Sequence, residues 1–304
     1  MSNISFTVAS GRTVGVTSFG DAGAERLVVF CHSAPGSSVF DPDPLVSDTS
    51  GLRIVALDRP GYGASDPLPS GRWPSIGRFA DDIAEYLRSL TRDEEGNGIA
   101  GPRTFGIAGW SAGGRVALAV AARHPDLIDR VAIIATPAPN EAVQWIDPQL
   151  SALSAELGAL SPDAAIANLG SMLGAQLAPV LEPTGDLPLP LDMVGASDAD
   201  GDVLDLPGAR DRLERMVRDA FRQGARGLAA DILSYTVRDW GFDFEDVRAK
   251  TLIVAGKADA IAGDAHANWY RGNLADSHVE VVPHRSHLVV IPEWNRVLTH
   301  LAGA

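Results

Sequence analysis

Residues 104–114, Thr-Phe-Gly-Ile-Ala-Gly-Trp-Ser-Ala-Gly-Gly, form the stretch around which the rest of the chain is organised. The stretch begins as an apolar run, ends in small residues, and is followed at 115–122 by a run rich in Val and Ala. This pattern predicts a buried strand, a sharp turn at Ser111, and a helix packed back onto the strand. Small neighbours in the Gly-x-Ser-x-Gly turn let the serine adopt a strained backbone conformation. We therefore expect the Ser111 hydroxyl to stand exposed above a sheet edge, at a helix start that favours negative charge.

The size and composition of the chain limit its class. A length of 304 residues with 45% hydrophobic side chains allows one large domain, or one core with an insertion, and excludes global disorder. The formal net charge of −14 argues against nucleic acid and anionic membranes as partners, so we expect a small-molecule substrate. The single cysteine, Cys31, forms no internal disulfide, and no signal peptide or membrane-spanning run is recognisable. These features predict a soluble, cytoplasmic protein.

Short apolar runs recur along the chain and alternate with helical patterns. An N-terminal hairpin is expected from the alternating residues at 4–8 and 13–18, and an amphipathic helix at 76–90. Buried strands are expected at 27–31, which is a continuous apolar run, and at 53–57. Further strands are expected at 127–135, 251–255 and 279–282. Strands that alternate with helices predict an α/β fold, with a mainly parallel sheet and helices on both faces.

The alternation stops after Pro137 and resumes after about Asp239. Helical patterns and Pro-rich breaks lie between, which predicts a mostly helical insertion at 138–240, a candidate cap, between core segments 1–137 and 241–304. Spaced carboxylates at 198–202 suit calcium, but their Gly is displaced from the calcium-loop pattern and no Glu stands at the bidentate position. We therefore expect a solvated turn there and no metal. Because no Gly-x-Gly-x-x-Gly or phosphate-binding loop is present, no cofactor is expected either.

Three polar side chains are placed just past the carboxyl ends of three predicted strands: Ser111, Asp259 and His287. In an open parallel sheet, this edge is where ligands bind. A serine hydroxyl needs an imidazole to take its proton, and a carboxylate must hold the imidazole tautomer and stabilise its cation. The chain order Ser, Asp, His is the order associated with one fold.

With these residues in place, the sequence resembles the α/β-hydrolase superfamily over about residues 1–137 and 241–304. The resemblance rests on four motifs: Gly109-Trp110-Ser111-Ala112-Gly113, Asp58-Arg59-Pro60-Gly61-Tyr62-Gly63, Gly256-Lys257-Ala258-Asp259, and His287 followed by Ile291-Pro292-Glu293. The insertion resembles the variable cap of the family in position only.

The resemblance implies a role for each motif residue. Ser111 would be the nucleophile, His287 the general base and Asp259 its orienting acid. The N–H groups of Ala112 and Ala34 would form the oxyanion hole. Relatives usually carry Gly in this loop where the present chain has Ser33.

The function predicted from this set is that of a serine hydrolase, which cleaves a small or medium carboxylic ester through an acyl-enzyme on Ser111. Amides, lactones and carbon–carbon bonds beside a ketone remain open as alternatives. So do a small-molecule binding protein and a cofactor-free oxygenase or lyase on the same fold. An epoxide hydrolase or dehalogenase is disfavoured, because those relatives use Asp where Ser111 stands. The sequence does not predict the oligomeric state.

Two choices within the site depend on position alone. His287 is preferred to His284 as the base, because the apolar run at 288–292 should anchor its loop in the core. Asp259 is preferred to Glu141, which stands one strand earlier, where some relatives place the acid.

The pocket is expected to be lined by small or apolar residues from the core loops and from the insertion, which would form its roof. The candidates are His32, Ser33 and Trp110 in the core, and Trp145, Met172, Leu173 and Met193 in the insertion.

Overall fold

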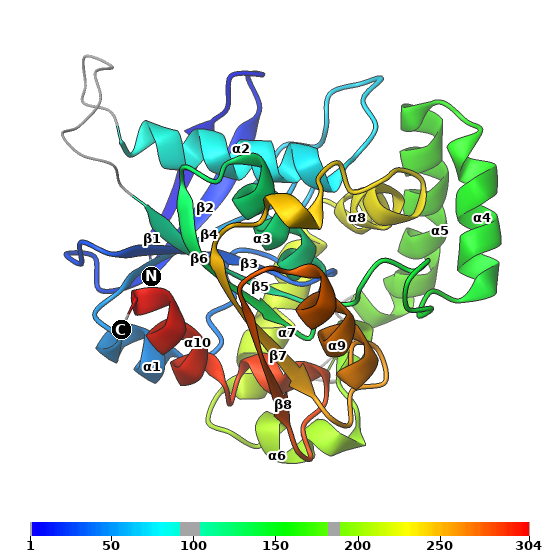
Figure 1. The fold of residues 1–304 in the computed structure, drawn as a ribbon. Helices are drawn as coiled ribbons and strands as arrows, with labels where there is room; N and C mark the ends of the chain where they lie inside the picture. Colours follow the sequence, from blue (N-terminus) through cyan, green and yellow to red (C-terminus); the bar gives the residue numbers. More distant parts are fainter. Residues whose placement is uncertain (1, 92–103, 182–188, 304) are drawn as a thin grey trace.

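The computed structural model describes residues 2–91, 104–181 and 189–303, and within them one β-sheet is flanked by helices (Figure 1). The sheet has eight strands in the order β1-β2-β4-β3-β5-β6-β7-β8. Strands β3 to β8 are parallel, whereas β1 and β2 form an antiparallel hairpin that continues the sheet beyond β4. The bounds are β1 Ser2–Thr7, β2 Thr13–Gly20, β3 Leu27–Cys31, β4 Arg53–Leu57, β5 Phe105–Trp110, β6 Ile128–Ile134, β7 Lys250–Gly256 and β8 Ser277–Val282.

The parallel strands lie within about two residues of the apolar runs that predicted them. Strands β3 and β5 are buried along their whole length, as expected for strands covered on both faces. The predicted fold class, a mainly parallel α/β sheet with helices on both faces, is therefore confirmed.

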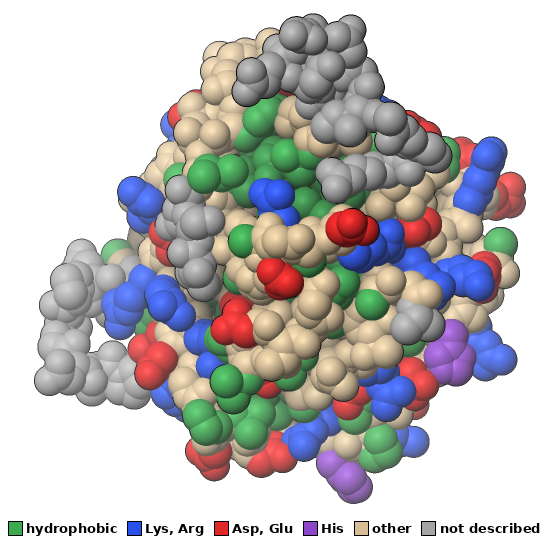
Figure 2. Space-filling view, turned by 90° about the vertical axis from the view of Figure 1, so that its left-hand side faces the viewer, with side chains coloured by type: hydrophobic (Ala, Val, Ile, Leu, Met, Phe, Trp, Pro, Cys, Tyr) green, Lys and Arg blue, Asp and Glu red, His purple; other side chains and the backbone are tan. Residues whose placement is uncertain are grey.

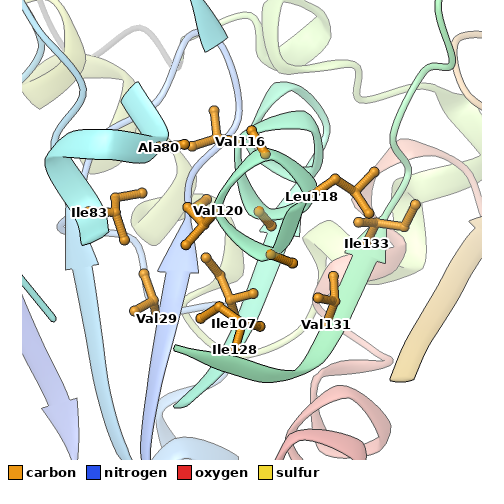
Figure 3. Close-up of a cluster of buried hydrophobic side chains, with 14 of the residues drawn as sticks. Val29, Ala80, Ile83, Ile107, Val116, Leu118, Val120, Ile128, Val131 and Ile133 are labelled. Atoms are coloured by element: carbon orange, nitrogen blue, oxygen red, sulfur yellow. The ribbon is translucent and has the colours of Figure 1, made fainter. Parts of the chain in front are cut away.

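Three helices cover one face of the sheet: α2 (Ile76–Ser89), α3 (Ala112–Arg123) and α9 (Asp264–Asn273). Their apolar side chains join those of the strands in one buried cluster. Figure 3 shows its centre, where Val120 of α3 lies close to Ile107 of β5. Because α3 is buried on nearly every side, it holds its N-terminus rigidly above the end of β5.

Helices α1 (Pro44–Thr49) and α10 (Trp294–Ala302) cover the opposite face. The indole N–H of Trp294 donates a hydrogen bond of 2.9 Å to the Ser47 hydroxyl, which joins the two helices. Helix α7 (Ala209–Ala220), which belongs to the insertion, packs into the same apolar cluster. Part of the insertion is thus an integral layer of the core.

Helices replace strands between β6 and β7, as predicted. Helices α4, α5 and α8 pack on one another through a separate apolar cluster and lie together at one side of the sheet (Figure 1). The described elements of the insertion are α4 Pro148–Gly158, α5 Pro162–Leu181, η1 Leu191–Val194, η2 Asp198–Asp200, α6 Gly201–Leu204, α7 and α8 Arg226–Thr236. Two short helices, η3 Phe244–Asp246 and η4 His287–Val290, lie in the second core segment.

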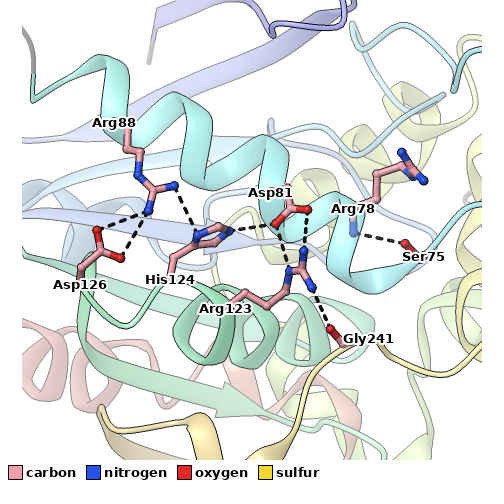
Figure 4. A network of polar contacts seen from close by, with 8 residues as sticks. All are labelled: Ser75, Arg78, Asp81, Arg88, Arg123, His124, Asp126 and Gly241. Atoms are coloured by element: carbon pink, nitrogen blue, oxygen red, sulfur yellow. Dashed lines mark hydrogen bonds and ion pairs between the residues drawn. The ribbon is translucent and has the colours of Figure 1, made fainter.

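A polar network joins α2 to the end of α3 and to the segment that returns from the insertion (Figure 4). Asp81 accepts from Arg123 at 2.8 Å and from His124 at 2.9 Å, and Arg123 also donates to the Gly241 carbonyl at 2.9 Å. The Ser75 hydroxyl caps the start of α2. Exposed ion pairs of this kind each contribute about 0–1 kcal/mol to the free energy of unfolding, so their main effect is to orient α2 relative to α3.

Acidic and basic side chains are interspersed on the face shown in Figure 2, and apolar side chains gather in its upper part. None of the helices described combines the length and apolarity needed to cross a bilayer. The cytoplasmic location stays a prediction.

Candidate active site

Ser111 lies between β5 and α3 with φ 56° and ψ −121°, a backbone conformation that L-residues rarely adopt. A Cβ on Gly109 would stand 2.2 Å from the Gly113 carbonyl oxygen, and a Cβ on Gly113 would stand 2.0 Å from the Cys31 carbonyl oxygen. The helix therefore starts closer to β5 and β3 than any side chain permits. The predicted sharp turn at Ser111 is confirmed, and the glycines beside it are a packing requirement.

The structure brings Ser111, His287 and Asp259 into one hydrogen-bonded chain. His287 Nε2 lies 2.9 Å from Ser111 Oγ, and His287 Nδ1 lies 2.9 Å from Asp259 Oδ2. The imidazole and the carboxylate are both buried. Asp259 Oδ1 accepts from the backbone N–H groups of Ile261 at 2.8 Å and Ala262 at 3.1 Å.

The environment of Asp259 keeps its carboxylate ionised. Burial alone would raise the pKa of Asp259, but hydrogen bonds from His287 and from the Ile261 and Ala262 amides outweigh burial and lower the pKa. Asp259 therefore holds its charge into the acid range where an ordinary aspartate, with a pKa of about 3.9, takes up its proton.

The two alternative residues lie apart from this chain. His284 is exposed, with φ 60°, and Glu141 is exposed in the segment that follows β6. His287 is anchored as the sequence suggested, because the residues after it, Leu288 and Val289, are fully buried. The indole N–H of Trp110 also donates to the His287 carbonyl at 2.9 Å.

Ala34 and Ala112 both line a cavity at Ser111. In the described part of the chain, neither backbone N–H has a hydrogen-bond acceptor. These amides come from two different elements, the loop after β3 and the first residue of α3. Both are therefore available to an oxygen bound next to Ser111.

A buried cation holds the loop that carries Ala34. The Arg59 guanidinium donates to the carbonyls of His32 at 2.7 Å and Ser33 at 2.8 Å, and it forms an ion pair of 2.6 Å with Asp231 of α8. Arg59 thus ties the loop to the insertion. Both charges of the pair are buried, so loss of either partner would leave the other unpaired, at a typical cost of about 3–5 kcal/mol.

Ser33 occupies its position without backbone strain. It is not among the residues with positive φ, so glycine is not required there. Its hydroxyl donates to the Pro35 carbonyl at 2.9 Å. Burial, assisted by the Arg59 charge, lowers the pKa of the neighbouring His32 well below its usual value, so that ring stays neutral.

A sequence model of the α/β hydrolase fold matches residues 26–293, which include every element of the site just described. The chain belongs to the α/β-hydrolase fold family. The predicted family and the coarser part of the functional prediction, an α/β-hydrolase, are thereby confirmed.

The chain is similar in sequence to two known proteins and in fold to a third. The chain is 28% identical over 285 residues to a 2-(acetamidomethylene)succinate hydrolase of Mesorhizobium japonicum. This alignment covers 90% of the present chain and 86% of the relative. It is also 29% identical over 237 residues to a pimeloyl-[acyl-carrier protein] methyl ester esterase of Chromobacterium violaceum, in an alignment that covers 77% of the present chain and 76% of the relative. The structure of a bromoperoxidase from Bacillus anthracis shares the fold, with a TM-score of 0.70 and 20% identity over 100% of both chains.

The cavity of this α/β-hydrolase has a volume of about 160 Å³, which is smaller than the roughly 300–1,000 Å³ of most ligand pockets. Among the predicted lining residues, Ser33, Trp145 and Met193 lie in its wall. The other residues of the wall are Ala34, Ser111, Ala112, Arg115, Pro137, Asp192, Val194, Gly195, Tyr235, Ile261 and His287.

Four of the predicted lining residues do not line this cavity. His32 and Trp110 are fully buried beneath the site, where the His32 ring accepts from the Arg59 backbone N–H and the Trp110 indole donates to the His287 carbonyl. Met172 of α5 is exposed, and Leu173 packs between two apolar clusters. Apolar character alone did not distinguish a side chain that faces the cavity from one that faces the core or solvent.

Several residues of the cavity wall were not predicted from the sequence, although one of them, Arg115, stands out in the sequence. Arg115 is the sole charged residue in the run 112–122, yet the helix there is buried. A charge in such a run indicates a partner or a ligand. Gly195 and Tyr235 carried no comparable signal, because only the fold of the insertion brings them to Ser111.

The acids at 198–202 are used within the fold. Asp200 accepts from the Ser197 backbone at 3.0 Å, and Asp202 forms an ion pair with Arg285. In the described part of the chain, no group of three or more His, Cys, Asp or Glu side chains is placed to hold a metal ion.

Gly195 of the insertion contacts the His287 ring. A Cβ at this position would lie 2.4 Å from His287 Cδ2, and Gly195 has φ +83°. We expect Gly195→Ala to lower kcat/KM by roughly 100-fold, because a displacement of the imidazole by about 1 Å has an effect of that size. The measurement is steady-state hydrolysis of one ester, together with the melting temperature.

Gly224→Ala is the matched control for this prediction. Gly224 also lies in the insertion and has φ +78°, but no atom lies within 4 Å of its Cβ position. Backbone strain of about 1 kcal/mol is therefore common to both variants, and only one meets the imidazole. Equal activity losses in the two variants would refute the contact with His287.

Proposed function

We propose that this protein is a serine hydrolase that cleaves a small or medium carboxylic ester through an acyl-enzyme on Ser111. The observation that carries the proposal is the hydrogen-bonded chain Asp259–His287–Ser111, with 2.9 Å at each side-chain contact. A serine hydroxyl is a weak nucleophile until a neighbouring base takes its proton. Asp259 fixes the ring tautomer so that Nε2 is the nitrogen that accepts the proton.

In the proposed reaction, His287 takes the Ser111 proton while Oγ attacks the carbonyl carbon of the substrate. The oxygen of the tetrahedral intermediate accepts hydrogen bonds from the N–H groups of Ala34 and Ala112. His287 then passes its proton to the leaving alcohol, and the acyl-enzyme remains. A water molecule, deprotonated by His287, releases the acid and restores Ser111. Asp259 stays ionised and stabilises the His287 cation.

In this proposal, the insertion forms the roof of the site. Trp145, Met193, Gly195 and Tyr235 come from it and line the cavity. Since the cavity is only about 160 Å³, we expect short acyl groups to be preferred over long chains.

An ester is our first choice of bond because the Chromobacterium violaceum relative is named as a methyl ester esterase. The Mesorhizobium japonicum relative is named as a hydrolase of 2-(acetamidomethylene)succinate, so an amide stays among the alternatives. Lactones and carbon–carbon bonds beside a ketone are open to the same attacking group, and the choice among these bonds is part of the test.

A fluorophosphonate probe tests the nucleophile directly, because it phosphonylates an activated serine. We expect one equivalent of label per wild-type chain, located by peptide mass at Ser111, and none in Ser111→Ala with an unchanged circular dichroism spectrum. A panel of p-nitrophenyl esters of two to eight acyl carbons, with matched amides, lactones and diketones, should show the fastest acid release from short esters.

Two outcomes would contradict the proposed function. An unlabelled wild-type chain that binds ligands but releases no acid would be a binding protein. Oxygen uptake, or release of a carbonyl compound without acid, would instead identify an oxygenase or lyase on this fold.

A further inference from the structure

We propose that Arg115 forms a carboxylate-binding subsite in the active-site cavity, so that the acyl group of the substrate carries a second, ionised carboxylate. The substrate class is then the monoesters of short dicarboxylic acids. This inference rests on the proposed function, because it specifies what the cavity beside Ser111 accepts.

Arg115 and Ser111 face the same small cavity. Arg115 follows Ser111 by four residues on α3, which at 1.5 Å per residue is about 6 Å along the helix axis. Both residues line the cavity, although Arg115 is only 2% exposed. A short substrate could therefore contact the Arg115 guanidinium and the Ser111 hydroxyl at the same time.

No carboxylate among the described residues forms an ion pair with the Arg115 guanidinium. Its Nε–H reaches the Pro137 carbonyl at 3.5 Å, the outer limit of a hydrogen bond, and its buried Nη1 has no partner among the described residues. Asp192, the acidic residue that lines the same cavity, is exposed, and no ion pair joins it to Arg115. A buried guanidinium nitrogen without an acceptor is costly, and the N–H groups of Nη1 remain available to a ligand.

The other buried arginine near the site, Arg59, shows how this fold satisfies a guanidinium with a structural role. Arg59 is paired with Asp231 at 2.6 Å and donates to the carbonyls of His32 and Ser33. In the described part of the chain, Arg115 has no ion pair, and its one hydrogen-bond acceptor is the Pro137 carbonyl at 3.5 Å. The ion pair and hydrogen bonds of Arg59 satisfy its guanidinium, whereas Arg115 keeps a buried Nη1 without a described acceptor.

Three aromatic rings lie close to the Arg115 guanidinium. Its central carbon lies 4.8 Å from the Trp145 ring centroid, 4.3 Å from Tyr235 and 5.4 Å from Trp240. Cation–π contacts act at ring faces, whereas a carboxylate binds a guanidinium edge-on in its own plane. Burial is the largest cause that lowers the pKa of Arg115, and a bound carboxylate would offset that cost while the arginine keeps its charge.

The test compares charged and neutral esters of the same shape. We would measure kcat/KM for monomethyl succinate, glutarate and adipate, and for the three matched methyl esters in which a primary amide replaces the free carboxylate. For at least one chain length, the wild type should prefer the carboxylate by at least about 10-fold, as expected for a charge-assisted pair in a buried site.

Arg115→Gln should abolish this preference by lowering kcat/KM for the charged ester by about 30-fold or more, with little change for the neutral ester. Arg123→Gln is the matched control, since Arg123 ends the same helix and pairs with Asp81 outside the cavity. The control should retain the preference of the wild type. An equal loss on both esters in Arg115→Gln would show a structural role and overturn the proposal.

Failure of the subsite is distinguishable from failure of the proposed function. If Ser111 takes the fluorophosphonate label and neutral esters are cleaved, but no dicarboxylate monoester is preferred, the subsite is wrong and the hydrolase stands. If Ser111 is neither labelled nor required for ester turnover, the proposed function itself is wrong.

A second measurement keeps the proposal testable if Arg115→Gln does not fold. In the wild type, succinate, glutarate and adipate should slow labelling of Ser111 competitively, whereas their diamides at equal concentration should not. Absence of protection by all three dicarboxylates, or equal protection by the diamides, would overturn the carboxylate subsite.

Discussion

If the proposed function holds, His287→Ala should lower kcat by a factor on the order of 10⁶, as loss of the catalytic histidine does in a serine protease. The reason is that the imidazole contacts both Ser111 Oγ and the Asp259 carboxylate at 2.9 Å, so no other group in the chain of contacts can take the proton. The measurement is ester hydrolysis by the purified variant, with circular dichroism and melting temperature to show that the fold persists.

His284→Ala is the matched control, because it removes an imidazole three residues earlier on the same loop. His284 is exposed and lies outside the cavity wall, so its loss should change kcat/KM by less than about threefold. Near-wild-type activity in His287→Ala, or a large loss in His284→Ala, would refute the assignment of the base.

Asp259→Asn should lower turnover by about 10⁴-fold while the fold is kept. The amide oxygen of Asn can still accept from the N–H groups of Ile261 and Ala262, which now bind Asp259 at 2.8 and 3.1 Å. Its NH₂ group would then face His287 Nδ1 and favour the tautomer that leaves no acceptor toward Ser111. The loss should therefore appear in kcat, with the melting temperature little changed.

Glu141→Gln tests the alternative acid with the same chemical change. Glu141 is exposed in the segment after β6 and lies outside the cavity wall, so its kcat should stay close to that of the wild type. If Glu141→Gln loses the activity and Asp259→Asn keeps it, the acid has been assigned to the wrong strand end.

The sheet and the order of the site residues were predictable because their signals are local. Strands β3, β4, β5 and β7 are buried along most of their length, so each leaves a largely apolar run in the sequence. The turn at Ser111 is also local, since helix α3 approaches β5 so closely that only glycine fits at Gly109 and Gly113.

The backbone conformation at residue 33 was not predictable from the family pattern. Glycine is usual there in relatives, yet Ser33 has no positive φ, and the loop is held through its carbonyl oxygen by Arg59. The pairing of Arg59 with Asp231, 172 residues later, depends on where α8 packs, and a local pattern does not record it.

The sequence by itself determined the α/β sheet, the strained turn and the Ser-Asp-His order, because buried strands and tight turns impose their patterns on neighbouring residues. Only the tertiary structure decided which side chains meet at Ser111. Gly195 reaches the His287 ring, and Trp145 and Tyr235 join Arg115 in the cavity wall, because the insertion folds back over the carboxyl end of the sheet. Such contacts join residues far apart in the chain, and they depend on how helices pack rather than on any periodicity within them.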